Sequence, residues 1–162
     1  MNKFMEGSQQ LGECLRKYGF ILALAESCTA GGLAYAITSL PGSSIYFDRG
    51  FITYSNQAKQ EMLNVSPDLL SRYGAVSEEV VIAMAEGALK FSKATVALAI
   101  TGIAGPDGGT IDKPVGCVWF GLVAQKKPKQ SICKYFSGDR QSIREQAIEF
   151  SLEVLLEYTQ IA

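Results

Sequence analysis

The sequence predicts an α/β protein: a three-layer α/β/α sandwich with a mixed, mostly parallel sheet. Short apolar runs alternate with segments of helical periodicity, which is typical of parallel strands joined by helices. Two strand-like segments late in the chain are joined by a short turn, which indicates an antiparallel part. The 162 residues suffice for one domain and its core, so we expect a single domain over residues 1–162.

The first quarter of the chain is predicted to hold two helices around one buried strand. Residues 6–18 have apolar side chains at helical spacing, and Gly19 ends this helix. Residues 20–25 are continuously apolar, as in a strand that is buried on both faces. Residues 29–40 form the second helix, which Pro41 stops.

The next segments are predicted to continue the alternation. Residues 43–48 are a loop or a short strand, and residues 50–54 are an apolar strand. Ser55 or Asn56 then caps a short helix that runs through Leu63.

The second half begins with a helix at Ser77, marked by an apolar stripe. The remaining predicted elements are, in order, a buried strand at 95–103, strands at 115–124 and 130–136 joined by a turn at 126–129, and a long helix at 140–159.

The composition excludes several classes of partner. The net charge is -1 and the basic residues are spread along the chain, so there is no electrostatic footprint for nucleic acid. The apolar runs are too short to span a bilayer, and the N-terminus does not resemble a signal peptide. We therefore expect a cytoplasmic protein with no nucleic-acid or membrane partner.

The chain has four cysteines and no histidine. No CxxC pair is present, so we expect no metal site. Cys14, Cys117 and Cys133 are predicted to be buried, reduced thiols. Cys28 differs because it adjoins Ser27, where a thiolate would be a rival nucleophile.

Ser27 follows an apolar run and precedes a predicted helix, which is where free backbone N–H groups suit an anion or an oxyanion. A serine nucleophile needs a base, and the usual histidine is absent from this chain. The alternative is that Ser27 only caps the helix, although Thr29 could do the same.

Lys59 is the candidate base. It falls near the first turn of a predicted helix, where the helix dipole and burial would lower its pKa. Tyr54 lies just before this helix and is able to hydrogen-bond to Ser27 or Lys59. The alternative is a solvated surface lysine beside a core tyrosine.

Two further segments suit an anionic ligand. The glycine-bearing turn at 101–109 follows a predicted strand, so its backbone N–H groups can approach a ligand, although a plain turn explains the pattern equally well. Arg140 follows a good N-cap, Asp139, and opposes the helix dipole unless it shares an anion with the helix start. Arg144 lies one turn on and could add to this clamp. The alternative is an exposed Arg140 that bends away or pairs with an acid such as Glu145.

Three polar segments follow predicted strands: 26–32, 54–59 and 101–109. Ligands of open α/β sheets bind beyond the carboxyl ends of the strands. We therefore expect these segments to meet in one cleft.

Taken together, the motifs resemble those of the C-terminal domain family of the competence/damage-inducible protein, which includes stand-alone nicotinamide-nucleotide amidohydrolases. The resemblance runs over nearly the whole chain. It rests on the motifs at residues 25–29, 41–44, 49–59, 75–77, 101–106 and 136–140.

The resemblance implies an amidase that hydrolyses the carboxamide of nicotinamide mononucleotide to nicotinate mononucleotide and ammonia, a step of pyridine nucleotide salvage and NAD metabolism. Ser27, Tyr54 and Lys59 match the family's catalytic residues. The resemblance also implies nucleotide binding, without cofactor or metal, by Thr101, Gly102, Ile103, Ala104, Gly105 and Arg140.

From the residues we expect neutral Lys59 to take the Ser27 proton, directly or through Tyr54, so that Ser27 forms an acyl-enzyme. The backbone N–H groups expected to stabilise the oxyanion belong to Cys28, Thr29, Ala30 and Gly31. Ala30 departs from the family, in which many members have glycine there. The resemblance further implies a homo-oligomer, often a dimer. The alternative function is a pyridine-nucleotide-binding module without turnover.

Overall fold

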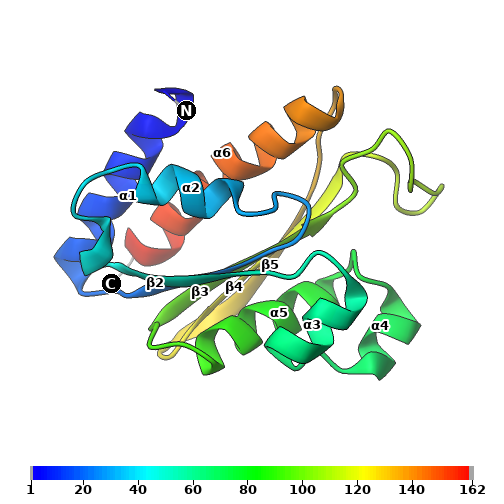
Figure 1. The fold of residues 1–162 in the computed structure, drawn as a ribbon, viewed down its shortest axis with the longest axis horizontal. Helices are drawn as coiled ribbons and strands as arrows, with labels where there is room; N and C mark the ends of the chain where they lie inside the picture. Colours follow the sequence, from blue (N-terminus) through cyan, green and yellow to red (C-terminus); the bar gives the residue numbers. More distant parts are fainter. Residues whose placement is uncertain (1, 161–162) are drawn as a thin grey trace.

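In the computed structural model, which describes residues 2–160, one β-sheet lies between two layers of helices (Figure 1). The strands are β1 (Leu22–Glu26), β2 (Phe47–Ile52), β3 (Val96–Gly102), β4 (Cys117–Ala124) and β5 (Lys127–Tyr135). The α-helices are α1 (Met5–Tyr18), α2 (Gly32–Thr38), α3 (Asn56–Leu63), α4 (Pro67–Tyr73), α5 (Glu78–Lys90) and α6 (Arg140–Gln160). Short 3-10 helices are η1 (Asn2–Phe4) and η2 (Ser43–Ile45). The predicted α/β/α sandwich is confirmed.

The sheet is five-stranded, with the order β2-β1-β3-β4-β5. β1 pairs in parallel with β2 and β3, whereas β4 pairs antiparallel with both β3 and β5. β4 therefore runs against the other strands of this sheet. The predicted mixed sheet is confirmed, and its antiparallel part is the late pair together with the neighbouring β3.

The two faces of the central strands carry side chains of different size. Leu22 and Leu24 of β1 face the layer of α1, α2 and α6, where they join the larger apolar core. Ala23 and Ala25 face the layer of α3, α4 and α5. β3 repeats this alternation, which is why α5 lies close against the sheet: a Cβ on Gly121 of β4 would come within 2.8 Å of the backbone oxygen of Val81.

The predicted helix ends are mostly confirmed. Gly19 ends α1 with a φ of 72°, in the left-handed region that glycine tolerates. Ser55 and Ser77 cap α3 and α5 by accepting hydrogen bonds from backbone N–H groups. Asp139 does the same for Ser142 at the start of α6.

Several elements differ from the prediction. The strand expected at residues 50–54 is β2, which begins at Phe47 and ends at Ile52. α2 begins only at Gly32, because residues 27–31 form a tight loop. The helix α4 was not predicted, although Ser66 as N-cap before Pro67 is its local signal. The turn placed at 126–129 is shorter, since β5 starts at Lys127 and keeps Pro128 on an edge strand, where a missing N–H is tolerated.

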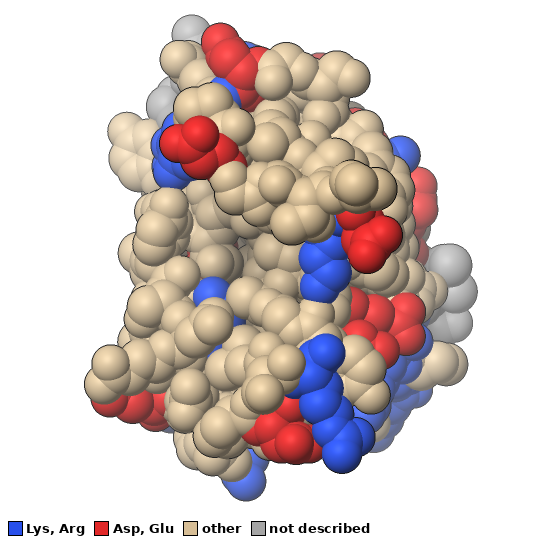
Figure 2. Space-filling view, turned by 90° about the vertical axis from the view of Figure 1, so that its right-hand side faces the viewer, with Lys and Arg blue, Asp and Glu red and all other residues tan. Residues whose placement is uncertain are grey.

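The carboxyl ends of β1, β2 and β3 lie at one edge of the sheet, as the parallel register requires. The segments 26–32, 54–59 and 101–109 leave the sheet at this edge, which confirms that they lie together. Figure 2 views the molecule from this side and shows a hollow bordered largely by uncharged atoms. No helix in residues 2–160 is long and apolar enough to cross a membrane.

Candidate active site

Ser27 comes directly after β1 and is almost fully buried. Its N–H donates to the carbonyl of Ile100 at 3.0 Å, which extends the pairing of β1 with β3 by one residue. Because α2 starts at Gly32, Ser27 is not its N-cap, and that alternative is wrong. Thr29 is not the cap either, since its hydroxyl donates to the Glu26 carboxylate at 2.6 Å.

Lys59 lies in the first turn of α3, and its side chain points back under the end of β1. Its Nζ is 3.1 Å from Ser27 Oγ and 2.8 Å from the carbonyl oxygen of Thr53. A longer contact of 3.5 Å joins Nζ to the carbonyl oxygen of Tyr54. Lys59 is only 1% exposed, so the alternative of a solvated surface lysine is wrong.

Burial lowers the pKa of Lys59 from 10.5 to about 8, because the charged amine loses its hydration. A group with this pKa is neutral in roughly a tenth of the molecules at pH 7 and in half of them near pH 8. A neutral amine beside a serine hydroxyl can accept its proton. The pair therefore has the geometry and the acidity that a serine nucleophile requires.

Cys28 is not prepared for the same role. Its side chain is buried in the apolar core, and burial raises the pKa of the thiol to about 11. The thiol stays protonated at neutral pH, and a thiol is a far weaker nucleophile than a thiolate. The structure therefore favours Ser27 over the neighbouring cysteine.

Tyr54 is half exposed, and its backbone and side chain point to different partners. Its carbonyl faces Lys59, whereas its phenol oxygen accepts a hydrogen bond from Arg140 Nη2 at 3.0 Å. Among the hydrogen bonds of residues 2–160, none joins the phenol to Ser27 or to the amine of Lys59. The direct Lys59–Ser27 contact leaves no gap for the phenol to bridge.

Arg140 connects two sides of the site from the first turn of α6. Besides its bond to Tyr54, its Nη1 donates to the carbonyl of Gly105 at 2.7 Å. Glu145 contacts Lys3, so the alternative pairing of Arg140 with Glu145 is wrong. Arg140 is exposed, which leaves its positive charge accessible to an anion.

Several groups of the turn after β3 already form hydrogen bonds within the protein. The hydroxyl of Thr101 donates to the carbonyl of Ala75 at 2.9 Å, and the N–H of Ile103 donates to Cys117 at 3.0 Å. Gly102 continues the pairing of β3 with β4. Ala104 and Gly105 lie beyond these bonds but are buried, and the carbonyl of Gly105 accepts from Arg140. Ligand binding by this turn stays a prediction.

Two charged residues hold the loop that follows Ser27: Glu26, which was not predicted, and Arg144, which was expected beside Arg140 in an anion clamp. Glu26 is 1% exposed, and its carboxylate accepts bonds from the N–H groups of Leu33 and Ala34. Arg144 donates to the carbonyls of Cys28 and Thr29. Glu26 is a carboxylate at the end of an apolar run, and this position was the sequence signal by which it could have been found.

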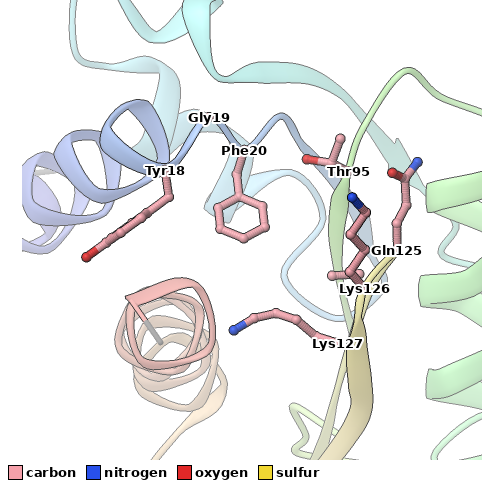
Figure 3. A pocket seen from close by; sticks show the side chains of 8 residues that line it. Tyr18, Gly19, Phe20, Thr95, Gln125, Lys126 and Lys127 are labelled. Carbon is pink, nitrogen blue, oxygen red and sulfur yellow. The ribbon is translucent and has the colours of Figure 1, made fainter. Parts of the chain in front are cut away.

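A cavity of about 560 Å³ lies at the opposite edge of the sheet (Figure 3). Its lining comes from the segments before β1 and β3 and from the turn between β4 and β5: Tyr18, Gly19, Phe20, Thr95, Ala124, Gln125, Lys126 and Lys127. None of these residues belongs to the predicted site.

Comparison with known proteins identifies the family. The model of the CinA C-terminal domain matches residues 5–159. The chain belongs to the CinA C-terminal domain family. The predicted resemblance is thereby confirmed.

Similar CinA-family proteins include stand-alone chains. The nicotinamide-nucleotide amidohydrolase PncC of Enterobacter agglomerans is 51% identical over 151 residues, which cover 93% of this chain and 92% of that protein. PncC of Escherichia coli strain K12 is 47% identical over 154 residues, covering 95% and 93%. A CinA-like protein of Syntrophobacter fumaroxidans is 52% identical over 145 residues, which cover 90% of this chain but 34% of that longer protein.

A solved structure of the family has the same fold. The competence/damage inducible protein CihA from Agrobacterium tumefaciens superimposes with a TM-score of 0.93 at 39% identity, covering 97% of this chain and 96% of the other. The agreement extends over both helical layers and the whole sheet.

Proposed function

We propose that this protein is an amidase that hydrolyses the carboxamide of nicotinamide mononucleotide, giving nicotinate mononucleotide and ammonia. The observation that carries the proposal is the buried contact of 3.1 Å between Lys59 Nζ and Ser27 Oγ, with the lysine pKa lowered to about 8. The names of the PncC relatives, which align over nearly their whole length, support this choice of substrate.

In the proposed reaction, neutral Lys59 takes the proton of Ser27 Oγ while the oxygen attacks the carboxamide carbon. The C–N bond then breaks, the proton passes from Lys59 to the departing nitrogen, and ammonia leaves. The remaining ester on Ser27 is attacked by water, whose proton Lys59 accepts and returns to Ser27. The direct Lys59–Ser27 contact supports this transfer without a phenol relay.

Backbone N–H groups of Cys28, Thr29, Ala30 and Gly31 are the proposed oxyanion donors, and such a donor is worth about 3–4 kcal/mol in other hydrolases. Two of them are less available, because the Ala30 N–H donates to the Ser27 carbonyl at 3.0 Å and Thr29 is fully buried. Arg140 and the end of the 101–105 turn are proposed to bind the 5′-phosphate. Tyr54 holds the Arg140 guanidinium in place.

The test is to incubate the pure protein with nicotinamide mononucleotide and to measure ammonia and nicotinate mononucleotide. The wild type should release both, Ser27→Ala should lose at least about a thousandfold in rate, and Cys28→Ala should keep most of its activity. Full activity of Ser27→Ala would overturn the nucleophile. Thermal stabilisation by the nucleotide with no ammonia would instead support the binding-module alternative.

Several finer points of the proposal rest on the sequence. A single amidohydrolase domain over residues 1–162, a cytoplasmic location and a homo-oligomer stay predictions. Gel filtration with light scattering measures the last of these directly.

A further inference from the structure

Arg144 reaches from α6 to the loop that follows the proposed nucleophile. Its Nε donates to the carbonyl of Cys28 at 3.0 Å, and its Nη2 donates to the carbonyl of Thr29 at 3.4 Å. The side chain is half-buried, and these two bonds engage consecutive peptide groups. Arg140, one turn earlier, has different partners, so the two arginines have separate roles.

These bonds determine where the loop's N–H groups point. In a trans peptide the C=O and the following N–H point in opposite directions. The Arg144 bonds therefore turn the N–H groups of Thr29 and Ala30 away from α6. The Ala30 N–H is taken up by the Ser27 carbonyl. The Thr29 N–H has no acceptor among residues 2–160.

The loop that Arg144 holds carries the proposed nucleophile. α6 and α3 cover opposite faces of the sheet, and Ser27 Oγ contacts Lys59 of α3. Thr29 is fully buried, so the Arg144 bonds act on the conformation of the loop as a whole. The conformation of such a loop decides whether its accessible N–H groups meet a developing oxyanion.

Glu26 holds the same loop from its other end. Its carboxylate accepts from the Thr29 hydroxyl at 2.6 Å and from the N–H groups of Leu33 and Ala34 at 3.0 and 2.9 Å. These contacts tie the loop to the first turn of α2. They also give the buried negative charge the donors that it needs.

We propose that Arg144 and Glu26 are positioning residues that hold the loop after Ser27 in the conformation that the transition state of the amidase reaction requires. The proposal rests on the proposed amidase function. Both residues then affect the rate of the chemical step rather than the binding of the nucleotide.

The experiment compares Arg144→Lys and Glu26→Gln with the wild type and with Arg72→Lys. Lysine keeps the charge of Arg144 but loses the guanidinium that spans two carbonyls. Glutamine keeps the size of Glu26 but presents an NH₂ group to donors. Arg72 is an exposed residue whose ion pair with Asp68 lies on the surface of α4, so its variant is the matched control.

Two quantities are measured: kcat and KM for nicotinamide mononucleotide at pH 8, and amide hydrogen exchange of peptides that cover residues 27–31. In both site variants kcat should fall roughly 10- to 100-fold while KM changes less than about twofold. Exchange should speed up in the loop and stay unchanged in peptides of α1 and α5. Arg72→Lys should match the wild type in every respect.

The results that would contradict the positioning role differ from those that would contradict the proposed function. A raised KM with unchanged kcat would mean that Arg144 binds the phosphate, and it would overturn the proposal. Unchanged loop exchange, or faster exchange in all peptides, would overturn it as well. A wild type that releases no ammonia would overturn the proposed function, and the exchange data would still decide whether the two residues hold the loop.

Discussion

The two edges of the sheet differ in how deeply their charged side chains are buried. At the carboxyl edge of the parallel strands, Glu26 and Lys59 are each 1% exposed and each has several hydrogen-bond partners. At the amino edge, a cavity of about 560 Å³ is bordered by Lys126 and Lys127 (Figure 3). Lys126 is exposed to solvent. This cavity thus lies away from the buried charges, and a cavity alone does not locate the chemistry.

The difference follows from the direction of the chain. α2, α3 and α6 all begin after strands that end at the carboxyl edge, so the N–H groups of their first turns collect there. The C-terminal end of α1 lies at the amino edge, so this helix presents carbonyl groups there rather than N–H groups. An edge rich in N–H donors suits carboxylates, phosphates and oxyanions.

The largest expected effect contrasts a lysine from each edge. Lys59→Met should lower ammonia release at least about a thousandfold, because Ser27 loses its base. Lys126→Met, at the amino-edge cavity, should leave the rate unchanged. Both variants are assayed with nicotinamide mononucleotide under the same conditions. Equal losses in the two would contradict the assignment of catalysis to the carboxyl edge.

The pH dependence of the rate should report the lowered pKa of Lys59. A base with a pKa of about 8 is active only when neutral, so the rate should rise about tenfold per pH unit below 8 and level off above it. The measurement is kcat/KM for nicotinamide mononucleotide from pH 6 to 9. A rate that is flat over this range would mean that Lys59 is not the base.

Lys59 should also reduce stability at neutral pH. Its pKa is lower in the folded state than its ordinary value of 10.5, so the unfolded chain binds more protons between about pH 8 and 10.5. The contribution of Lys59 to the free energy of unfolding therefore rises with pH through this window. Below it the cost of the buried charge is fully present.

Lys59→Met should therefore raise the free energy of unfolding by about 1 to 2 kcal/mol at pH 7, and by less near pH 10. Urea unfolding at the two pH values measures both gains, with Lys126→Met as the control. A gain that grows with pH would contradict the lowered pKa of Lys59.

The smallest expected effect concerns Ala30, whose φ of 47° lies in the left-handed region that L side chains rarely adopt. Ala30→Gly, which removes the side chain that this backbone conformation disfavours, should raise the free energy of unfolding by about 0.5 to 1 kcal/mol. Thermal unfolding measures the gain. A destabilised variant would show that the methyl group contributes more through contacts than it costs through strain.

Local signals predicted most of the elements, because caps and apolar runs act over a few residues. Ser55, Ser77 and Asp139 cap the helices that follow them, as their spacing indicated. The start of α2 was misplaced because the Glu26 carboxylate holds a loop after the strand, by accepting hydrogen bonds from N–H groups seven and eight residues further along the chain. Such a contact leaves no periodic trace in the sequence.

The sequence alone determined the alternation of helices and strands and the need for a base other than histidine. It also singled out Ser27 as the candidate nucleophile and Lys59 as the candidate base. Only the tertiary structure decided that β2 lies beside β1, which brings residues 32 positions apart to 3.1 Å. It also decided that the Tyr54 phenol turns to Arg140 and that Arg144 reaches the loop after Ser27. These contacts depend on strand order and on the packing of α6, which no short stretch of residues encodes.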